Sequence, residues 1–139
     1  MDRKEFLVTL GKGAAVAGIA FCTGCSVNGS DIPTAPSNID MTLDLSQPAN
    51  SALNTVGGSK VTDNGIIIGR TGASSFVAVS SACTHQGTTV QFQSNNNRFY
   101  CNNHGSAFAL DGSVTLGPAN RPLTKYNTQF SGNSLRIFS

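Results

Sequence analysis

Two short segments of this chain place cysteine and histidine at spacings suited to binding iron. One residue separates Cys83 from His85, two separate Cys101 from His104, and residues 86–100 lie between the segments. The chain has only these two histidines. Two thiolates and two imidazoles can hold a 2Fe–2S cluster. The thiolates would keep one iron ferric, and the neutral imidazoles would let the other iron accept an electron.

Zinc is the main alternative occupant, because four Cys and His ligands also bind zinc tetrahedrally. Zinc sites commonly take two cysteines from one arm and two histidines from the other, whereas each segment here supplies one of each. A zinc-stabilised module would be colourless and would unfold with chelators. A chance combination of buried cysteines and surface histidines is the other alternative, and a red-brown colour would exclude both.

The segments CTHQG (83–87) and CNNHGS (101–106) resemble the cluster-binding loops of Rieske iron–sulfur proteins. Residues 117–123, GPANRPL, resemble the proline-rich loop that covers the cluster in that family. The resemblance extends from about Gly65 to Phe138. It implies an all-β fold: a Rieske-type antiparallel β sandwich with a small cluster-binding subdomain formed by two loops, holding one 2Fe–2S cluster.

The resemblance also implies a role for each ligand. Cys83 and Cys101 would bind the inner iron, and His85 and His104 would bind the outer iron through Nδ1. Each Nε2 would then face solvent, where the electron, often with a proton, would cross. No catalytic residue is expected besides these metal ligands.

Four more residues are expected around the cluster. Gly87 and Gly105 would form tight turns that let backbone N–H groups point at the sulfurs. Ser106 matches a serine of the family whose hydroxyl bonds a bridging sulfide. Pro118, together with Pro122, would stiffen the loop that covers the cluster; an ordinary surface loop is the alternative.

Three positions bear on the redox potential. High-potential relatives carry a disulfide between the ligand loops, and its cysteines would fall at Thr88 and Asn103. They also carry a tyrosine that donates to a ligand thiolate, and Phe108 fills its position. Hydrogen bonds to sulfur stabilise the reduced cluster. Because only the Ser106 donor is kept, we predict an intermediate potential within the range of roughly −150 to +300 mV.

Residues 1–25 have the layout of a bacterial signal peptide, with a charged start and a weakly apolar stretch from Gly13 to Phe21. The start, RKEFL (3–7), resembles a twin-arginine signal with lysine in second place. Gly24-Cys25 resembles a lipobox, which predicts a diacylglycerol on the Cys25 sulfur. An uncleaved N-terminal anchor, release of a soluble protein, and a Cys22/Cys25 redox pair are the alternatives.

Residues 26–38 are rich in Ser, Pro and Asn, which predicts a flexible linker before a Rieske domain at 39–139. Hydrophobic residues make up 39% and charged residues 12%, with 15 glycines, which favours a turn-rich β domain without helices. Strands 89–93 and 98–101 flank a turn at 94–97, so their hairpin should bring both ligand loops to one end. No basic patch suggests nucleic acid.

The sequence therefore predicts a membrane-tethered one-electron carrier, exported to the periplasmic or outer side of the bacterial membrane. Its partner would be a cytochrome, a quinol-oxidising enzyme or a molybdenum enzyme, as in quinol:cytochrome c reductase or arsenite oxidase. A Rieske ferredoxin feeding an oxygenase is the second hypothesis: Phe108 and the missing disulfide favour it, but the export signal does not. A complete Rieske oxygenase would need two more histidines for its iron site.

Overall fold

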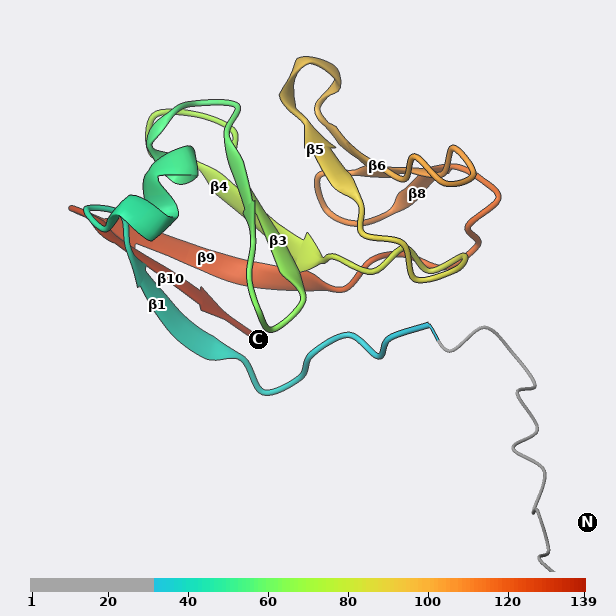
Figure 1. The fold of residues 1–139 in the computed structure, drawn as a ribbon, viewed down its shortest axis with the longest axis horizontal. Helices are drawn as coiled ribbons and strands as arrows, with labels where there is room; N and C mark the ends of the chain where they lie inside the picture. The colour runs from blue at the N-terminus through green and yellow to red at the C-terminus, as the bar shows by residue number, and fades with distance from the viewer. Residues whose placement is uncertain (1–31) are drawn as a thin grey trace, which may run out of the picture.

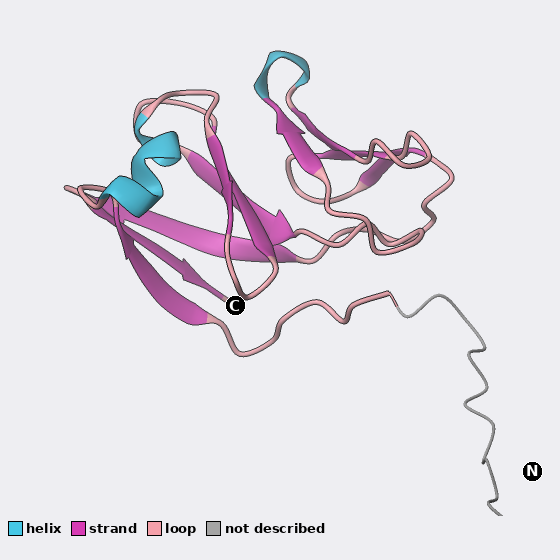
Figure 2. Ribbon diagram, viewed as in Figure 1, coloured by secondary structure: helices cyan, strands magenta, loops and turns pink. Residues whose placement is uncertain are grey.

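The computed structural model describes residues 32–139, and the predicted signal peptide lies outside them. All strand pairs are antiparallel, which confirms the expected β fold (Figures 1 and 2). The larger sheet has the strand order β1-β10-β9-β4-β3-β2. Its strands are β1 (Asp40–Asp44), β2 (Ser59–Val61), β3 (Ile66–Arg70), β4 (Phe76–Ser80), β9 (Lys125–Ser131) and β10 (Ser134–Phe138).

The larger sheet encloses the first of two hydrophobic cores. Strand β10 shows the expected alternation, with Leu135 and Ile137 fully buried between exposed Ser134 and Arg136. The β1, β9 and β10 side of the sheet packs against the β3 and β4 side. The buried residues of this core are Leu45, Leu53, Ile66, Ile68, Phe76, Ala78, Tyr126, Leu135 and Ile137.

Within residues 32–139, two 3-10 helices occur where we expected none. Helix η2 (Pro48–Asn54) begins at a proline and inserts Leu53 into the first core. A single buried leucine in a short 3-10 segment leaves no helical periodicity in the sequence. Helix η3 (Ser94–Asn96) forms the tip of the predicted hairpin and ends at Asn97, whose φ is 48°.

The smaller sheet carries both candidate ligand segments at one end. Its order is β5-β6-β7-β8, and Phe92 pairs with Phe99 in the hairpin. One ligand segment precedes β5, and the other connects β6 to β7, so the hairpin brings them together as predicted. The strands are β5 (Gln91–Gln93), β6 (Arg98–Tyr100), β7 (Ala107–Ala109) and β8 (Val114–Leu116).

Strand β3 separates the two cores. Ile66 and Ile68 face the first core, whereas Ile67 packs in the second core with Val79 and Phe99. Because side chains alternate along a strand, the three consecutive isoleucines place apolar side chains on both faces of β3, and so in both cores. The second core also contains Cys83 and Cys101, so it forms the floor of the ligand segments.

Candidate functional site

The first ligand loop (residues 83–88) is a closed turn that starts at its cysteine. The Cys83 N–H donates to the Thr88 carbonyl at 2.8 Å, and the Gly87 N–H donates back to the Cys83 carbonyl at 2.7 Å. Gly87 has a φ of 78°, in the left-handed region that favours glycine. This turn places His85 two residues after the cysteine.

The second ligand loop (residues 101–106) repeats the same hydrogen bonds. The Cys101 N–H donates to the Ser106 carbonyl at 2.8 Å, and the Gly105 N–H donates to the Cys101 carbonyl at 3.0 Å. Gly105 has a φ of 81°. Both predicted glycines thus lie in tight turns of one kind, although the histidine sits one residue later here. Their contact with a cluster stays a prediction.

The four candidate ligands form two pairs at different depths. Cys83 and Cys101 are 1% and 2% exposed, and their thiols contact each other. The Nδ1 atoms of His85 and His104 lie 3.2 Å apart, with the rings edge to face. His104 is exposed and His85 is half-buried. The site therefore has a sulfur pair on its buried side and a nitrogen pair at the surface.

The electrostatic environment of Cys83 suits a site that binds positive charge. Burial raises the pKa of the Cys83 thiol, and the neighbouring Cys101 thiol raises it further. The backbone N–H groups of His85 and Gln86 act in the opposite direction because they donate to the sulfur. Two adjacent buried thiols are costly to ionise unless a cation is bound between them.

This donor set fits a binuclear cluster with two sulfur and two nitrogen ligands. The two Nδ1 atoms face each other, as they would if both bound one iron, and the two thiols are positioned to bind the other. Within residues 32–139, no three His, Cys, Asp or Glu side chains gather around one ion position.

The cover loop (residues 117–124) is held over the ligand loops by hydroxyl groups. The Ala119 N–H donates to Ser106 Oγ at 3.0 Å, and Thr84 Oγ1 donates to the Arg121 carbonyl at 2.6 Å. Ser106 is fully buried, whereas Pro118 is exposed. Sequence reasoning found Ser106 but missed Thr84, because a hydroxyl that bonds a backbone group 37 residues away leaves no local pattern.

Two of the positions that bear on the potential have defined surroundings. Asn103 Nδ2 donates to Gln86 Oε1 at 3.4 Å, which joins the two ligand loops by a long hydrogen bond. Phe108 is fully buried in the second core with both cysteines. Its ring offers no donor to a thiolate, as the sequence indicated.

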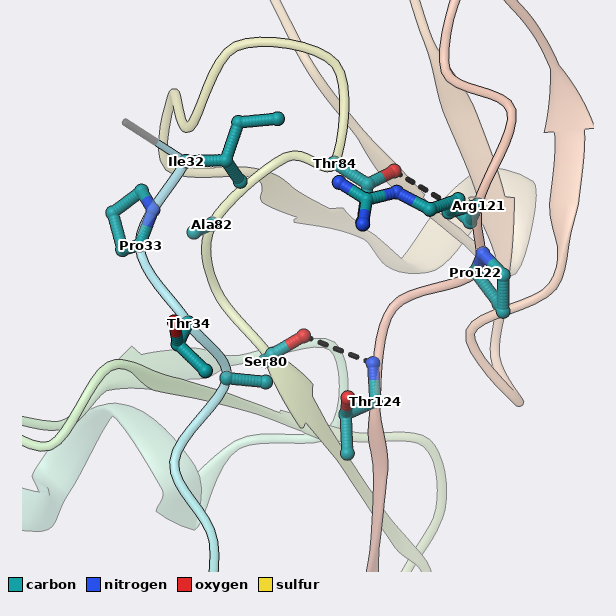
Figure 3. A pocket seen from close by; sticks show the side chains of 10 residues that line it. Ile32, Pro33, Thr34, Ser80, Ala82, Thr84, Arg121, Pro122 and Thr124 are labelled. Carbon is teal, nitrogen blue, oxygen red and sulfur yellow. Dashed lines mark hydrogen bonds between the residues drawn. The ribbon is translucent and has the colours of Figure 1, made fainter. Parts of the chain in front are cut away.

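Part of the predicted linker lies against the first ligand loop. The Tyr126 hydroxyl donates to the Pro36 carbonyl at 2.6 Å. A Cβ at Gly87 would lie 2.8 Å from Pro33 Cδ, so the two residues are in close contact. Residues 32–35 also line a cavity of about 380 Å³ with Thr84 and Arg121 (Figure 3). Residues 32–36, here called the strap, were expected only as part of a flexible linker.

Comparison with known proteins gives a consistent result. The Rieske [2Fe-2S] domain family model matches residues 44–127, more than half of the chain. The cytochrome b6-f complex iron-sulfur subunit of Chlorobaculum thiosulfatiphilum is 35% identical over 75 residues, covering 54% of this chain and 40% of that protein. The chloroplastic subunit of Bigelowiella natans is 47% identical over 45 residues, 32% of this chain and 18% of that protein. The chain therefore matches two fifths or less of the length of these relatives.

Solved structures include similar folds. The plasma membrane Rieske protein PetC3 of Synechocystis PCC 6803 has 36% identity and a TM-score of 0.54, covering 64% of this chain and 93% of that one. The ferredoxin of carbazole 1,9a-dioxygenase from Nocardioides aromaticivorans IC177 has 21% identity and a TM-score of 0.53, covering 74% and 98%. At that identity, the ferredoxin shows likeness of fold alone. Within residues 32–139, we find no helix with the length and apolar character needed to cross a bilayer.

Proposed function

This chain belongs to the Rieske [2Fe–2S] family, and from that membership we propose that it is an exported, membrane-tethered electron carrier serving a respiratory oxidoreductase. Family membership makes it a Rieske-type electron carrier with a single 2Fe–2S cluster. The observation that carries the proposal is the two-sided site, with a buried thiol pair and a surface pair of imidazoles whose Nδ1 atoms lie 3.2 Å apart.

The buried and the surface side chains of the site have different roles. When bound, the cluster supplies a centre that gains and loses one electron. Cys83 and Cys101 would hold it on the side of the second core, where water is excluded. The backbone N–H groups of His85 and Gln86 are already directed at the Cys83 sulfur, where they would stabilise negative charge.

The imidazole side of the site provides the route to a partner. With their Nδ1 atoms facing each other, His85 and His104 can present Nε2 to the surface. The cover loop lies over another side of the site, held there by its hydrogen bonds with Ser106 and Thr84. A partner that contacts the imidazole edges would therefore approach the cluster more closely than from any other side.

Membrane tethering and a respiratory partner are the finer parts of the proposal. The lipobox-like Gly24-Cys25 and the signal-like start support export and anchoring. Relatives named as cytochrome b6-f subunits, and a neighbour named as a plasma membrane Rieske protein, support a role at a membrane. Donor and acceptor would be a cytochrome, a quinol-oxidising enzyme or a molybdenum enzyme.

The proposal is tested in two steps. Iron and acid-labile sulfide are assayed on protein purified without oxygen, and the reduced protein is examined by EPR. Equal amounts of iron and sulfide, with a rhombic signal of a reduced cluster, are expected; their absence would end the electron-carrier proposal. Membrane fractionation and mass spectrometry of the mature N-terminus then test anchoring, and a mature protein that retains Met1 or Cys22 would exclude lipidation at Cys25.

A ferredoxin that feeds an oxygenase is a second candidate, favoured by the buried, donor-free ring of Phe108 and by the missing disulfide. Both features lower the potential. Fractionation separates the two candidates, because those oxygenase systems are cytoplasmic. Protein in the cytoplasmic fraction, copurifying with an oxygenase, would support the ferredoxin.

A further inference from the structure

We propose that Arg121 is a docking residue that binds a carboxylate side chain of an acidic redox partner beside the exposed imidazoles. This inference rests on the proposed function, since it specifies the surface and the charge of the partner. It identifies one positively charged residue of the cover loop as a contact for that partner.

Within residues 32–139, the Arg121 side chain makes no hydrogen bond or ion pair; the Lys125 side chain makes none either, but its charge acts on Asp111. The other cations each bond a carbonyl, an amide oxygen or a carboxylate, or lie near a carboxylate. These are Lys60 with Ala49 and Asn50, Arg70 with Leu53, Gly72 and Ala73, Arg98 with Gln93, Arg136 with Asp40, and Lys125 near Asp111. Only the backbone carbonyl of Arg121 is engaged, by Thr84. Its guanidinium is free to bind an external group.

The surroundings of Arg121 are otherwise uncharged. The two ligand loops and the cover loop contain no Asp or Glu, so nothing there neutralises the guanidinium. Asp63 lines a neighbouring cavity on the other side of the strap. Arg121 is therefore the one cation of the two ligand loops and the cover loop, and a negatively charged partner is attracted to it.

A hollow beside the guanidinium can accept a side chain from a partner. The cavity of about 380 Å³ lies between the strap, the first ligand loop and the cover loop, and Figure 3 shows Arg121 reaching over it beside Thr84. Thr34, Ser80 and Thr124 add hydroxyl groups to its wall. A carboxylate matches this chemistry because a guanidinium offers it two parallel N–H donors, and hydroxyls can donate as well.

The position of Arg121 links docking to electron exit. Thr84, which bonds the Arg121 carbonyl at 2.6 Å, directly precedes the ligand His85. A carboxylate bound at Arg121 would therefore bring the partner surface against the imidazole edge. Because Thr84 bonds the backbone of Arg121, a change of the Arg121 side chain leaves this anchor of the cover loop in place.

The test measures oxidation of the reduced holoprotein by two small complexes of opposite charge in a stopped-flow instrument. The cobalt(III)–EDTA anion presents carboxylates, and tris(phenanthroline)cobalt(III) is a cation. In each case one electron passes to cobalt(III), which becomes cobalt(II). We expect Arg121→Gln to slow the reaction with the anion about threefold at low ionic strength and to speed the reaction with the cation. Both changes should vanish in 1 M salt.

Three controls make the result specific. Arg98→Gln removes the same charge at the far end of the β5–β6 hairpin, and both of its rates should stay near those of the wild type. Arg121→Lys keeps the charge and should retain most of the rate with the anion. The reduction potential is measured for each variant, because a change in driving force would move both rates in the same direction.

Every outcome decides the proposal. Equal rates for Arg121→Gln and the wild type, parallel changes with both complexes, or the same effect from Arg98→Gln would each overturn the docking role. Inorganic phosphate at constant ionic strength should compete for the same guanidinium and reduce the difference between wild type and Arg121→Gln, and no effect of phosphate would count against binding at Arg121. These results leave the electron-carrier function standing; that function fails only if the wild-type protein contains no cluster.

Discussion

Ser106 connects the cover loop to the ligand loops through one fully buried hydroxyl. Its oxygen accepts the Ala119 N–H at 3.0 Å, so its own proton remains available to a sulfide of the cluster. The predicted hydroxyl–sulfide bond and the observed loop contact are therefore compatible. Loss of this one side chain should affect both stability and potential.

We predict that Ser106→Ala lowers the reduction potential and the free energy of unfolding together. The potential falls because a donor to sulfur is lost, and stability falls by about 1–3 kcal/mol because the buried Ala119 N–H loses its acceptor. Film voltammetry and denaturant unfolding measure the two effects. Ser80→Ala is the matched control, since Ser80 Oγ likewise accepts a cover-loop N–H, from Thr124 at 2.9 Å. It should lower stability alone, and an equal fall in potential would contradict the role of Ser106.

The two buried cysteines give a direct test of ligation. We predict that Cys101→Ser lowers the iron and acid-labile sulfide content to background, because one iron loses half of its protein ligands. Cys22→Ser, which removes a cysteine from the predicted signal peptide, should keep the wild-type content. Normal iron content in Cys101→Ser would remove Cys101 from the ligand set.

At the scale of elements, the ligand loops are two copies of one turn. Each begins at a cysteine, is closed by two backbone hydrogen bonds, and contains a glycine of positive φ four residues later. The histidine occupies the third position in one turn and the fourth in the other. The two loops therefore share one backbone hydrogen-bond pattern, and the unequal Cys–His spacing arises because the histidine stands one residue later in the second loop.

Because the strap packs against Gly87, replacing this glycine should cost more stability than replacing an ordinary turn glycine. We predict that Gly87→Ala costs about 2–4 kcal/mol, because a strained φ of 78° combines with a Cβ only 2.8 Å from Pro33 Cδ. Gly132→Ala is the control: its φ is 60° but nothing lies within 4 Å, so about 1 kcal/mol is expected. Urea unfolding of both holoproteins measures the difference. Equal losses would show that the strap does not press on the loop.

At the scale of the whole molecule, the larger sheet supports the site through one shared strand and one tyrosine. Strand β3 contributes isoleucines to both cores, so the floor of the cluster site is continuous with the sandwich. Tyr126 is buried in the first core, yet its hydroxyl reaches Pro36 in the strap. The stability of the sandwich and the position of the strap are therefore coupled.

This coupling predicts a loss of stability at alkaline pH. Burial raises the pKa of Tyr126 above its unfolded value, so its contribution to stability is complete below about pH 10 and is lost as pH rises through the raised pKa. We expect Tyr126→Phe to show a shallower alkaline decline in the free energy of unfolding. It should also lose about 1 kcal/mol at neutral pH with the bond to Pro36. Tyr100→Phe is the control, and an unchanged alkaline decline in Tyr126→Phe would refute the assignment.

The local parts of the site could be predicted from the sequence. The hairpin around residues 94–97, the two ligand loops and the glycine turns all lie within short segments that carry their own turn residues. Helix η2 could not be predicted, because Leu53 gives no periodic signal. The strap was also missed, because its contacts join Pro36 to Tyr126, 90 residues away.

The amino-acid sequence by itself determined which atoms can bind a cluster, since the types and spacing of Cys83, His85, Cys101 and His104 are local properties. The family resemblance already implied the pairing of thiol with thiol and imidazole with imidazole. Only the tertiary structure showed that the thiols are buried to 1% and 2% exposure and that the strap lies against the first ligand loop. It also placed Arg121 at one cavity with Thr84 and the strap. The physical reason is that turns are encoded by neighbouring residues, whereas burial and long-range hydrogen bonds depend on surfaces that meet only when both cores are packed.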